Sequence, residues 1–230
     1  MNVFGYLQDP ARWTGPGNIV DLLLQHLAYV GVALALAAVV AIPLGLLLGH
    51  TGRAGFLATG LRGGARAVPT VGLLFLAVLL IGTNVVNVVV VLAILALPAI
   101  LVGTVTGIRA ADQLAVGSAR ALGLTEGQIL ARIEWPLALP VVLSGLCRAV
   151  VQLVGTVTIA AFASAGGLGQ LLVRGLAEQD YPQMFAGAVL VSALAIALHL
   201  VFSGLGLLAG RRTRPRSRRT VPAALAVAPS

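Results

Sequence analysis

The sequence predicts an all-α integral membrane protein with about five transmembrane helices. Hydrophobic residues make up 59% of the 230 residues and charged residues only 10%, whereas a soluble domain contains about 45–50% apolar and about 25% charged residues. The mean hydropathy is +1.02. The few charges are also clustered, which leaves long uncharged stretches between them. Lipid is therefore the expected solvent for most of the chain.

The uncharged stretches locate the expected spans, because about 20 apolar residues cross a bilayer as a helix. No Asp, Glu, Lys or Arg lies between Asp21 and Arg53, which suits one helix with a tolerated kink at Pro43. The 42 uncharged residues at 67–108 suit two helices with a turn at 82–84. Whether residues 50–66 add a short sixth segment stays open. The five expected spans lie near Leu27–Leu48, Val68–Ile81, Val85–Val105, Val141–Ala165 and Met184–Ala209.

The arginines predict the orientation of these spans, because basic residues are enriched in cytoplasmic loops. With the N-terminus outside, twelve arginines lie on the cytoplasmic side, whereas Arg12 and Arg174 lie outside and Arg148 lies just inside the fourth span. The C-terminus is then cytoplasmic. The twelve are Arg53, Arg62, Arg66, Arg109, Arg120, Arg132, Arg211, Arg212, Arg214, Arg216, Arg218 and Arg219.

The same pattern divides the chain into three parts. Residues 1–18 are a polar, turn-rich extracytoplasmic segment, and residues 19–209 form the transmembrane domain, which contains a cytoplasmic loop at 107–140. Residues 210–230 are a basic cytoplasmic tail that we expect to be disordered.

Several other classes of function are disfavoured. The isoelectric point near 11.4 invites a nucleic-acid interpretation, but the basic residues lie in loops and a tail, as membrane topology predicts. Cys147 lies alone in an apolar run and is expected to be a small buried residue. His26, His50 and His199 lack metal-ligand spacing and are expected at the interface or in packed positions. No metal site is predicted.

The expected spans also argue against an enzyme or a proton-coupled transporter. An ionisable residue near the centre of a span is the usual mark of a proton relay, and no expected span has one. No Walker motif is present, so the chain is not expected to hydrolyse ATP itself. The glycine-rich stretch 166–169 follows an expected membrane helix rather than a strand. Close backbone packing at the outer end is therefore preferred to phosphate binding, with a plain flexible turn as the alternative.

The loop at 107–140 has the pattern of a helical hairpin. One short helix suits residues 112–122, with Leu114, Ala115, Ala119 and Leu122 along one side; Gly123 then breaks it. Thr125 is expected to cap a second helix, in which Ile129, Leu130 and Ile133 form an apolar stripe. Pro136 and Pro140 are expected to end that helix and begin the next membrane segment. From the pattern alone, partner docking and a plain re-entry loop are both possible.

This loop resembles the characteristic cytoplasmic motif of ABC-importer permeases, in which an EAA triplet is followed by Gly and then by Ile-x-Leu-Pro. The similarity is greatest to the osmoprotectant family, whose loop reads roughly EAARGMGMT…QIL…VELPLALP. One departure is plain: the EAA triplet falls on Gly117-Ser118-Ala119, so its glutamate is missing. The matching residues are Arg120, Gly123, Leu124, Thr125, Gln128, Ile129, Leu130, Glu134 and Pro136-Leu137-Ala138-Leu139-Pro140.

The resemblance covers about residues 20–205. Residues 155–161 followed by 165–169 resemble the family's fourth-span signature, and Val68-Pro69-Thr70 resembles its IPSLALL segment. The resemblance implies two sets of site residues. The ATPase-coupling loop would contain Gly117, Ser118, Ala119, Arg120, Gly123, Leu124, Thr125, Ile129, Arg132, Pro136 and Pro140. The translocation path would contain Pro69, Thr70, Thr156, Thr158, Gly166, Gly167 and Gly169.

The resemblance implies a multi-pass permease subunit in a bacterial inner or plasma membrane. The family has a type I ABC importer fold and imports glycine betaine, choline, carnitine and related solutes by alternating access. The implied partners are two ABC ATPase subunits, a second permease subunit (identical or a sister chain) and an extracytoplasmic solute-binding protein. ATP and Mg²⁺ would be bound by the ATPase, and no cofactor is expected in this chain. With 5% aromatic residues, the chain is a poor place for an aromatic cage, so selectivity is expected mostly in the binding protein.

Two alternatives stay open. A permease of the same architecture could import another small solute, such as the amino acid methionine. A membrane scaffold without transport activity would keep the helices but would not need a loop that binds an ATPase. The exact solute, and the choice between a homodimer and a heterodimer, are not predicted.

Overall fold

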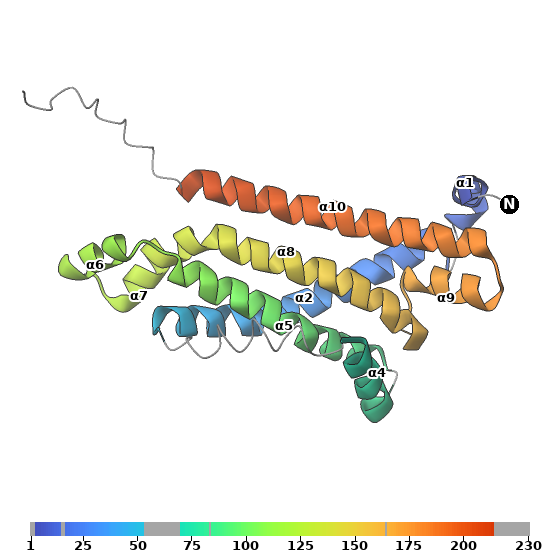
Figure 1. The fold of residues 1–230 in the computed structure, drawn as a ribbon, viewed down its shortest axis with the longest axis horizontal. Helices are drawn as coiled ribbons and strands as arrows, with labels where there is room; N and C mark the ends of the chain where they lie inside the picture. Colours follow the sequence, from blue (N-terminus) through green and yellow to red (C-terminus); the bar gives the residue numbers. More distant parts are fainter. Residues whose placement is uncertain (1–2, 15–16, 53–69, 83, 164, 214–230) are drawn as a thin grey trace, which may run out of the picture.

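The computed structural model describes residues 3–14, 17–52, 70–82, 84–163 and 165–213. Figure 1 shows an elongated bundle in which the long helices lie side by side, with a small helical hairpin at one end and short helices at the other. Pro69, the arginines at 53, 62 and 66, and most of the basic tail lie outside the described residues. The possible sixth segment at 50–66 also lies almost wholly outside them.

Four helices of the described chain are long and apolar enough to cross a membrane. They are α2 (Ile19–His50), α5 (Val85–Arg109), α8 (Trp135–Ala160), which continues the shorter helical turns before it, and α10 (Tyr181–Thr213). The remaining expected span corresponds to α4 (Thr70–Ile81), which has 12 residues and is too short to cross the hydrocarbon core alone. It lies beside the start of α5 (Figure 1).

Helix α2 begins earlier than the hydropathy pattern predicts, at Ile19 rather than near Leu27. Asp21 lies in the first turn, where a carboxylate interacts favourably with the free N–H groups, and its Oδ2 accepts a hydrogen bond from Gly17 N at 3.0 Å. Pro43 lies inside the helix, as expected. For α5, the Asn84 side chain accepts a hydrogen bond from Val86 N at 3.0 Å and caps the start of the helix.

The expectation that Pro136 and Pro140 separate two helices is wrong. Helix α7 (Glu126–Ile129) continues through a π-helical turn, η2 (Leu130–Glu134), directly into α8. Pro136 directly follows the π-helical turn, at the N-terminal end of α8. The wider π turn relieves crowding of the proline ring against the preceding carbonyl. The hairpin is therefore joined to the membrane helix without a break.

Helix α5 packs between α2 and α8, and glycine sets how closely they approach. A Cβ built on Gly103 would lie 2.7 Å from Gly145 Cα, and one on Gly45 would lie 2.6 Å from Thr104 Cβ. Contacts of this kind between small residues are typical of helices packed in lipid, because they maximise dispersion contact between backbones. The main core around this contact consists largely of Ala, Val and Leu side chains from the long helices.

Short helices cover the end of the bundle opposite the hairpin. Helix α1 (Val3–Gln8), the 3₁₀ turn η1 (Pro10–Arg12) and α9 (Gly169–Ala177) lie there (Figure 1). Tyr6 and Leu171 are part of a second buried cluster at this end. The polar N-terminal segment is thus folded onto the bundle through at least residues 3–14.

The Gly103–Gly145 contact predicts a packing defect on substitution. We expect Gly145→Ala to destabilise the folded chain by about 1–3 kcal/mol, because the added methyl must push α5 and α8 apart. The measurement is thermal unfolding of the purified chain in detergent micelles. The control is Gly31→Ala on α2, where a Cβ meets nothing within 4 Å, and where stability should change by less than about 1 kcal/mol. Equal melting temperatures for the two variants would contradict the tight packing.

Candidate functional site

The hairpin at the end of the bundle is built from two capped helices. Helix α6 (Gln113–Ala121) starts at Asp112, whose Oδ1 accepts a hydrogen bond from Leu114 N at 2.9 Å. Helix α7 starts at Thr125. Its hydroxyl accepts from Gln128 N at 3.4 Å, while Thr125 N donates to Gln128 Oε1 at 3.0 Å. This reciprocal capping box confirms the predicted cap at Thr125.

Gly123 makes the turn between α6 and α7. Its φ is +83°, a conformation that glycine adopts without a steric penalty. Gly123 N donates to Arg120 O at 2.9 Å and Leu124 N donates to Ala119 O at 3.1 Å, which closes the end of α6. A Cβ on Gly123 would meet nothing within 4 Å. The position therefore requires glycine for its backbone conformation and not for lack of space.

The hairpin has a small core of its own. Val116, Ala119 and Ile129 are buried, and Leu124 and Ile133 pack against them. The predicted apolar stripe around Ile129 therefore lies inside the hairpin and not on its surface. Helix α6 also presents a different face from the one expected, because Val116 rather than Leu114 shares the inner side with Ala119.

Two leucines of α6 are left on the surface. Leu114 and Leu122 are each 81% exposed, the second and third highest values among the large hydrophobic side chains of the described residues. Leucines this exposed, at the end of the bundle that carries polar and charged loops, favour contact with another protein.

A chain of polar and charged side chains connects the hairpin to the end of α2. Arg120 donates to Glu126 from Nε at 2.8 Å and from Nη2 at 2.9 Å. The second oxygen of Glu126 lies 3.1 Å from His50 Nε2, and His50 Nδ1 lies 2.7 Å from Glu134 Oε2. The hydrogen bonds that Arg120 donates to Glu126, and then the negative charge of Glu126, raise the pKa of Arg120 above its ordinary value.

The buried member of this network is Glu134, which is 5% exposed. The Arg120–Glu126 pair is about half exposed and is screened by solvent, whereas a buried carboxylate depends strongly on its partner. The buried contact between His50 and Glu134 therefore holds α2 against the helix that leaves the hairpin. Sequence reasoning missed His50, because its partners are far away in the chain.

Other residues predicted for the ATPase-coupling loop lie on the hairpin surface or at the start of α8. Gly117, Ser118 and Arg132 are exposed, and Pro136 is half-buried at the start of α8. A Cβ on Gly117 would meet nothing within 4 Å. The glutamate that is missing at this position would therefore fit, and its absence removes a negative charge without altering the hairpin's packing.

The two threonines predicted to line the translocation path donate hydrogen bonds from their hydroxyls to backbone carbonyls of their own helix. Thr156 Oγ1 donates to Gln152 O at 2.8 Å, and Thr158 Oγ1 donates to Val154 O at 2.9 Å. Thr156 is buried and Thr158 is half-buried. Thr70 is the first residue of α4. A role for these residues in the path stays a prediction.

The glycine-rich stretch packs tightly against two helices, as expected. Gly166 and Gly167 have φ values of +87° and +74°, and Gly167 N donates to Gln25 Oε1 at 2.9 Å. A Cβ on Gly167 would lie 3.1 Å from His26 Nδ1, and one on Gly169 would collide with Thr158 O. The glycines therefore bring this loop against α2 and the end of α8 at the end of the bundle opposite the hairpin.

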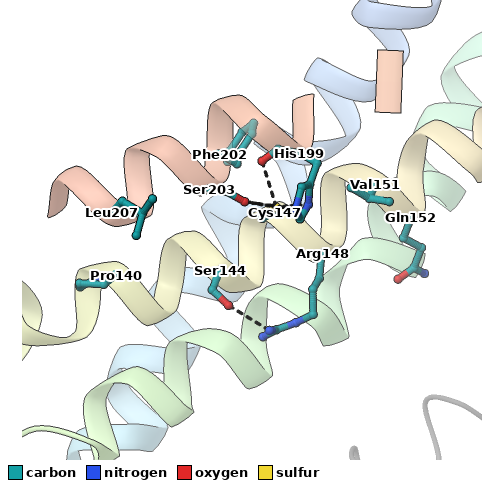
Figure 2. A pocket seen from close by; sticks show the side chains of 11 residues that line it. Pro140, Ser144, Cys147, Arg148, Val151, Gln152, His199, Phe202, Ser203 and Leu207 are labelled. Carbon is teal, nitrogen blue, oxygen red and sulfur yellow. Dashed lines mark hydrogen bonds between the residues drawn. The ribbon is translucent and has the colours of Figure 1, made fainter. Parts of the chain in front are cut away.

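A cleft of about 840 Å³ lies between α8 and α10 in the membrane region (Figure 2). Its α8 side includes Pro140, Ser144, Cys147, Arg148 and Gln152, and its α10 side includes His199, Phe202 and Ser203. Cys147 is buried, as predicted, with Sγ 3.2 Å from His199 Nδ1. The Arg148 Nη1 donates to Ser144 Oγ at 3.0 Å.

The expectation that no span has an ionisable residue near its centre is wrong. It placed Arg148 just inside a span beginning at Val141, but α8 begins at Trp135 and continues from α7. Arg148 is thus near the middle of the helix, and it is exposed. The described residues contain no group of three or more metal-ligating side chains.

The chain resembles solved permease structures of ABC transporters. An inward-facing structure of the MetNI methionine ABC transporter matches with a TM-score of 0.73 at 21% identity, covering 88% of this chain and 99% of that chain. A structure of an amino acid ABC transporter with histidines matches with a TM-score of 0.58 at 20% identity, covering 84% and 93%. At this identity the likeness shows the fold alone.

Curated relatives are more similar in sequence. An osmoprotectant import permease protein of Salmonella typhimurium is 35% identical over 209 residues, covering 86% of this chain and 92% of the relative. A carnitine transport permease protein of Listeria monocytogenes is 32% identical over 184 residues, covering 80% and 82%. A choline transport system permease protein of Bacillus subtilis is 30% identical over 206 residues, covering 89% and 91%.

A family model for the inner membrane component of binding-protein-dependent transport systems matches residues 11–215. The match includes the four long helices, the hairpin and the cleft. The chain therefore belongs to the family of binding-protein-dependent transport system inner membrane components.

Proposed function

We propose that this chain is the permease subunit of an ATP-driven importer for osmoprotectants such as glycine betaine, carnitine or choline. The observation that carries the proposal is the hairpin, which has its own core and yet leaves Leu114 and Leu122 on its surface. A plain re-entry loop or a scaffold would not need two exposed leucines there. The solute class is supported by the relatives' transport of osmoprotectants, carnitine and choline. The alternative methionine-type solute has only the likeness of fold in its favour.

The proposed orientation places the hairpin in the cytoplasm and α1 and α9 outside. Arg109, Arg120, Arg132 and Arg211 belong to the hairpin end of the bundle, whereas Arg12 and Arg174 belong to the opposite end. An excess of arginine on the hairpin side favours a cytoplasmic location for it. The ATPase would then meet the hairpin directly, and the solute-binding protein would meet the other end.

The attachment of the hairpin to the membrane helices suggests how ATP hydrolysis would be coupled to transport. The ATPase would bind ATP and Mg²⁺ and, on closing, would pull on α6 and α7. The unbroken helix from α7 through η2 into α8 would carry that motion into the membrane. The contact between His50 and Glu134 would carry it to α2. Movement of these helices past α5 would open the path alternately to each side.

The first test is to purify the tagged chain gently from its native membrane and to identify the proteins that remain bound. An ATPase is expected, together with a second permease copy or a sister permease. The reconstituted complex should take up radiolabelled glycine betaine, carnitine or choline when ATP and the binding protein are supplied. Recovery of the chain without any ATPase, even after crosslinking through residues 120–132, would favour the scaffold alternative.

We expect the double variant Leu114→Ser, Leu122→Ser to weaken ATPase binding by about tenfold or more, because burying one leucine in an interface contributes about 1.5–3 kcal/mol. The measurement is the amount of ATPase that co-purifies with the chain. The control is Leu176→Ser in α9, an exposed leucine at the opposite end of the bundle, which should retain the ATPase. Unchanged ATPase binding by the double variant would rule out this docking face.

We expect Gly123→Val to reduce solute uptake by roughly fivefold or more while leaving membrane insertion intact. A β-branched residue at a φ of +83° is strained by about 1–2 kcal/mol or more, so the turn between α6 and α7 would change. The measurement is uptake into proteoliposomes at matched protein amounts. Gly31→Val, at an open position on α2, is the control. Normal uptake by the Gly123 variant would argue against a rigid hairpin as the coupling element.

We expect His50→Ala to uncouple ATP hydrolysis from uptake. The nearly buried Glu134 would lose its partner, which costs about 1–3 kcal/mol, and α2 would no longer follow the hairpin. The measurement is solute taken up per ATP hydrolysed, which should fall several-fold. Thr51→Ala changes the neighbouring residue, whose hydroxyl bonds within the end of α2, and should leave the ratio unchanged. If the His50 variant took up as much solute per ATP as the wild type, the contact between His50 and Glu134 would stabilise the fold without transmitting motion to α2.

A further inference from the structure

Arg148 is a charged residue at a depth where charge is costly. At a rise of about 1.5 Å per residue it lies about 20 Å from Trp135 and about 18 Å from Ala160, the two ends of α8. The hydrocarbon core is about 30 Å thick. The side chain is exposed on the surface of the chain. A guanidinium in this position must face water, a counter-charge or both, because lipid would not solvate it.

The chain itself offers no counter-charge at this depth. It has seven acidic residues, and each belongs to one end of the bundle. None of the ion pairs among the described residues includes Arg148, whose Nη1 donates a hydrogen bond to the neutral Ser144 hydroxyl at 3.0 Å. Asp9, Asp21, Glu178 and Asp180 lie at the α9 end, and Asp112, Glu126 and Glu134 lie at the hairpin end.

The other polar groups of the cleft are already engaged. The Cys147 thiol, the His199 ring and the Ser203 hydroxyl contact one another. Gln152 Nε2 donates to Leu95 O at 3.3 Å. Arginine has five N–H donors, so the guanidinium is the group with most donors to spare beside the cleft (Figure 2).

The cleft is also poorly suited to bind a quaternary ammonium group. Such cations are held by cages of several aromatic rings, whereas Phe202 is the one aromatic residue among the described residues that line the cleft. A guanidinium, in contrast, matches a carboxylate by two parallel hydrogen bonds. The cleft is therefore better suited to bind an anion than a quaternary ammonium cation.

We infer that Arg148 binds the carboxylate of a zwitterionic solute as it passes through the cleft between α8 and α10. The inference rests on the proposed import function and narrows its substrate to carboxylated solutes such as glycine betaine and carnitine. In a homodimer the second copy has the same sequence, so it too has no acidic residue at this depth. The counter-charge must then arrive with the solute.

The test uses the complete importer, with its ATPase and binding protein, reconstituted in proteoliposomes. Uptake of glycine betaine and of choline, which has no carboxylate, is compared for the wild type, Arg148→Gln and Arg148→Lys. We expect Arg148→Gln to lower glycine betaine uptake by about tenfold or more and to lower choline uptake by less than about twofold. Arg148→Lys should restore part of the uptake, because it keeps the charge but loses the paired geometry. Arg211→Gln, an exposed arginine at the end of α10, is the matched control.

The outcomes of this test distinguish a failure of the inference about Arg148 from a failure of the proposed import function. If the wild type imports glycine betaine but not choline, purification of the Arg148→Gln importer with its ATPase at the wild-type yield serves as the folding control. If Arg148→Gln lowers both solutes equally, or neither, the inference fails and the import function stands. If Arg148→Gln releases the second permease subunit on purification, Arg148 pairs with an acidic residue of a sister chain and the inference fails. A wild-type importer that takes up none of these solutes would overturn the proposed function and the inference together.

Discussion

The close approach of α5 and α8 determines how the rest of the bundle is arranged. Where Gly103 faces Gly145, no side chain separates the two backbones. In lipid there is little hydrophobic force between helices, so dispersion contact of this kind holds them together. With one side of α8 packed on α5 and another on α10, the side that bears Ser144, Arg148 and Gly155 is left outside the chain's own packing.

The continuous helix from Glu126 to Ala163 joins three features that the sequence presents separately. It begins in the hairpin, passes Arg148 in the membrane and ends beside the glycine-rich loop. Its hydrogen-bond pattern changes in the π turn, where Glu134 reaches across to His50, and again in the 3₁₀ turn at Ala161–Ala163. The contact between His50 and Glu134 ties the π turn to the end of α2.

Periodicity and charge predicted much of this fold, and their failures have physical causes. The spans around Leu27–Leu48 and Val85–Val105, the break at Gly123 and the cap at Thr125 follow from local rules, which do not depend on the tertiary structure. The prediction of a helix break at Pro136 was wrong, because the π turn before it makes room for a proline inside a continuous helix. That one error displaced the start of α8 and hid Arg148 near the end of a span. The partners of His50 and the outward direction of Leu114 depend on packing between distant segments, which no local pattern contains.

A central cation without a fixed partner links solute binding to closure of the path. While the cleft is empty, the Arg148 guanidinium must be hydrated, so one side of the path has to stay open to water. A bound carboxylate takes over the hydrogen bonds of that water, and the cleft can then close without leaving the charge unsatisfied. Closure of an empty cleft would cost the full desolvation of the guanidinium. The residue that binds the solute would thus disfavour cycling without solute. It would thereby limit ATP hydrolysis that is not coupled to transport.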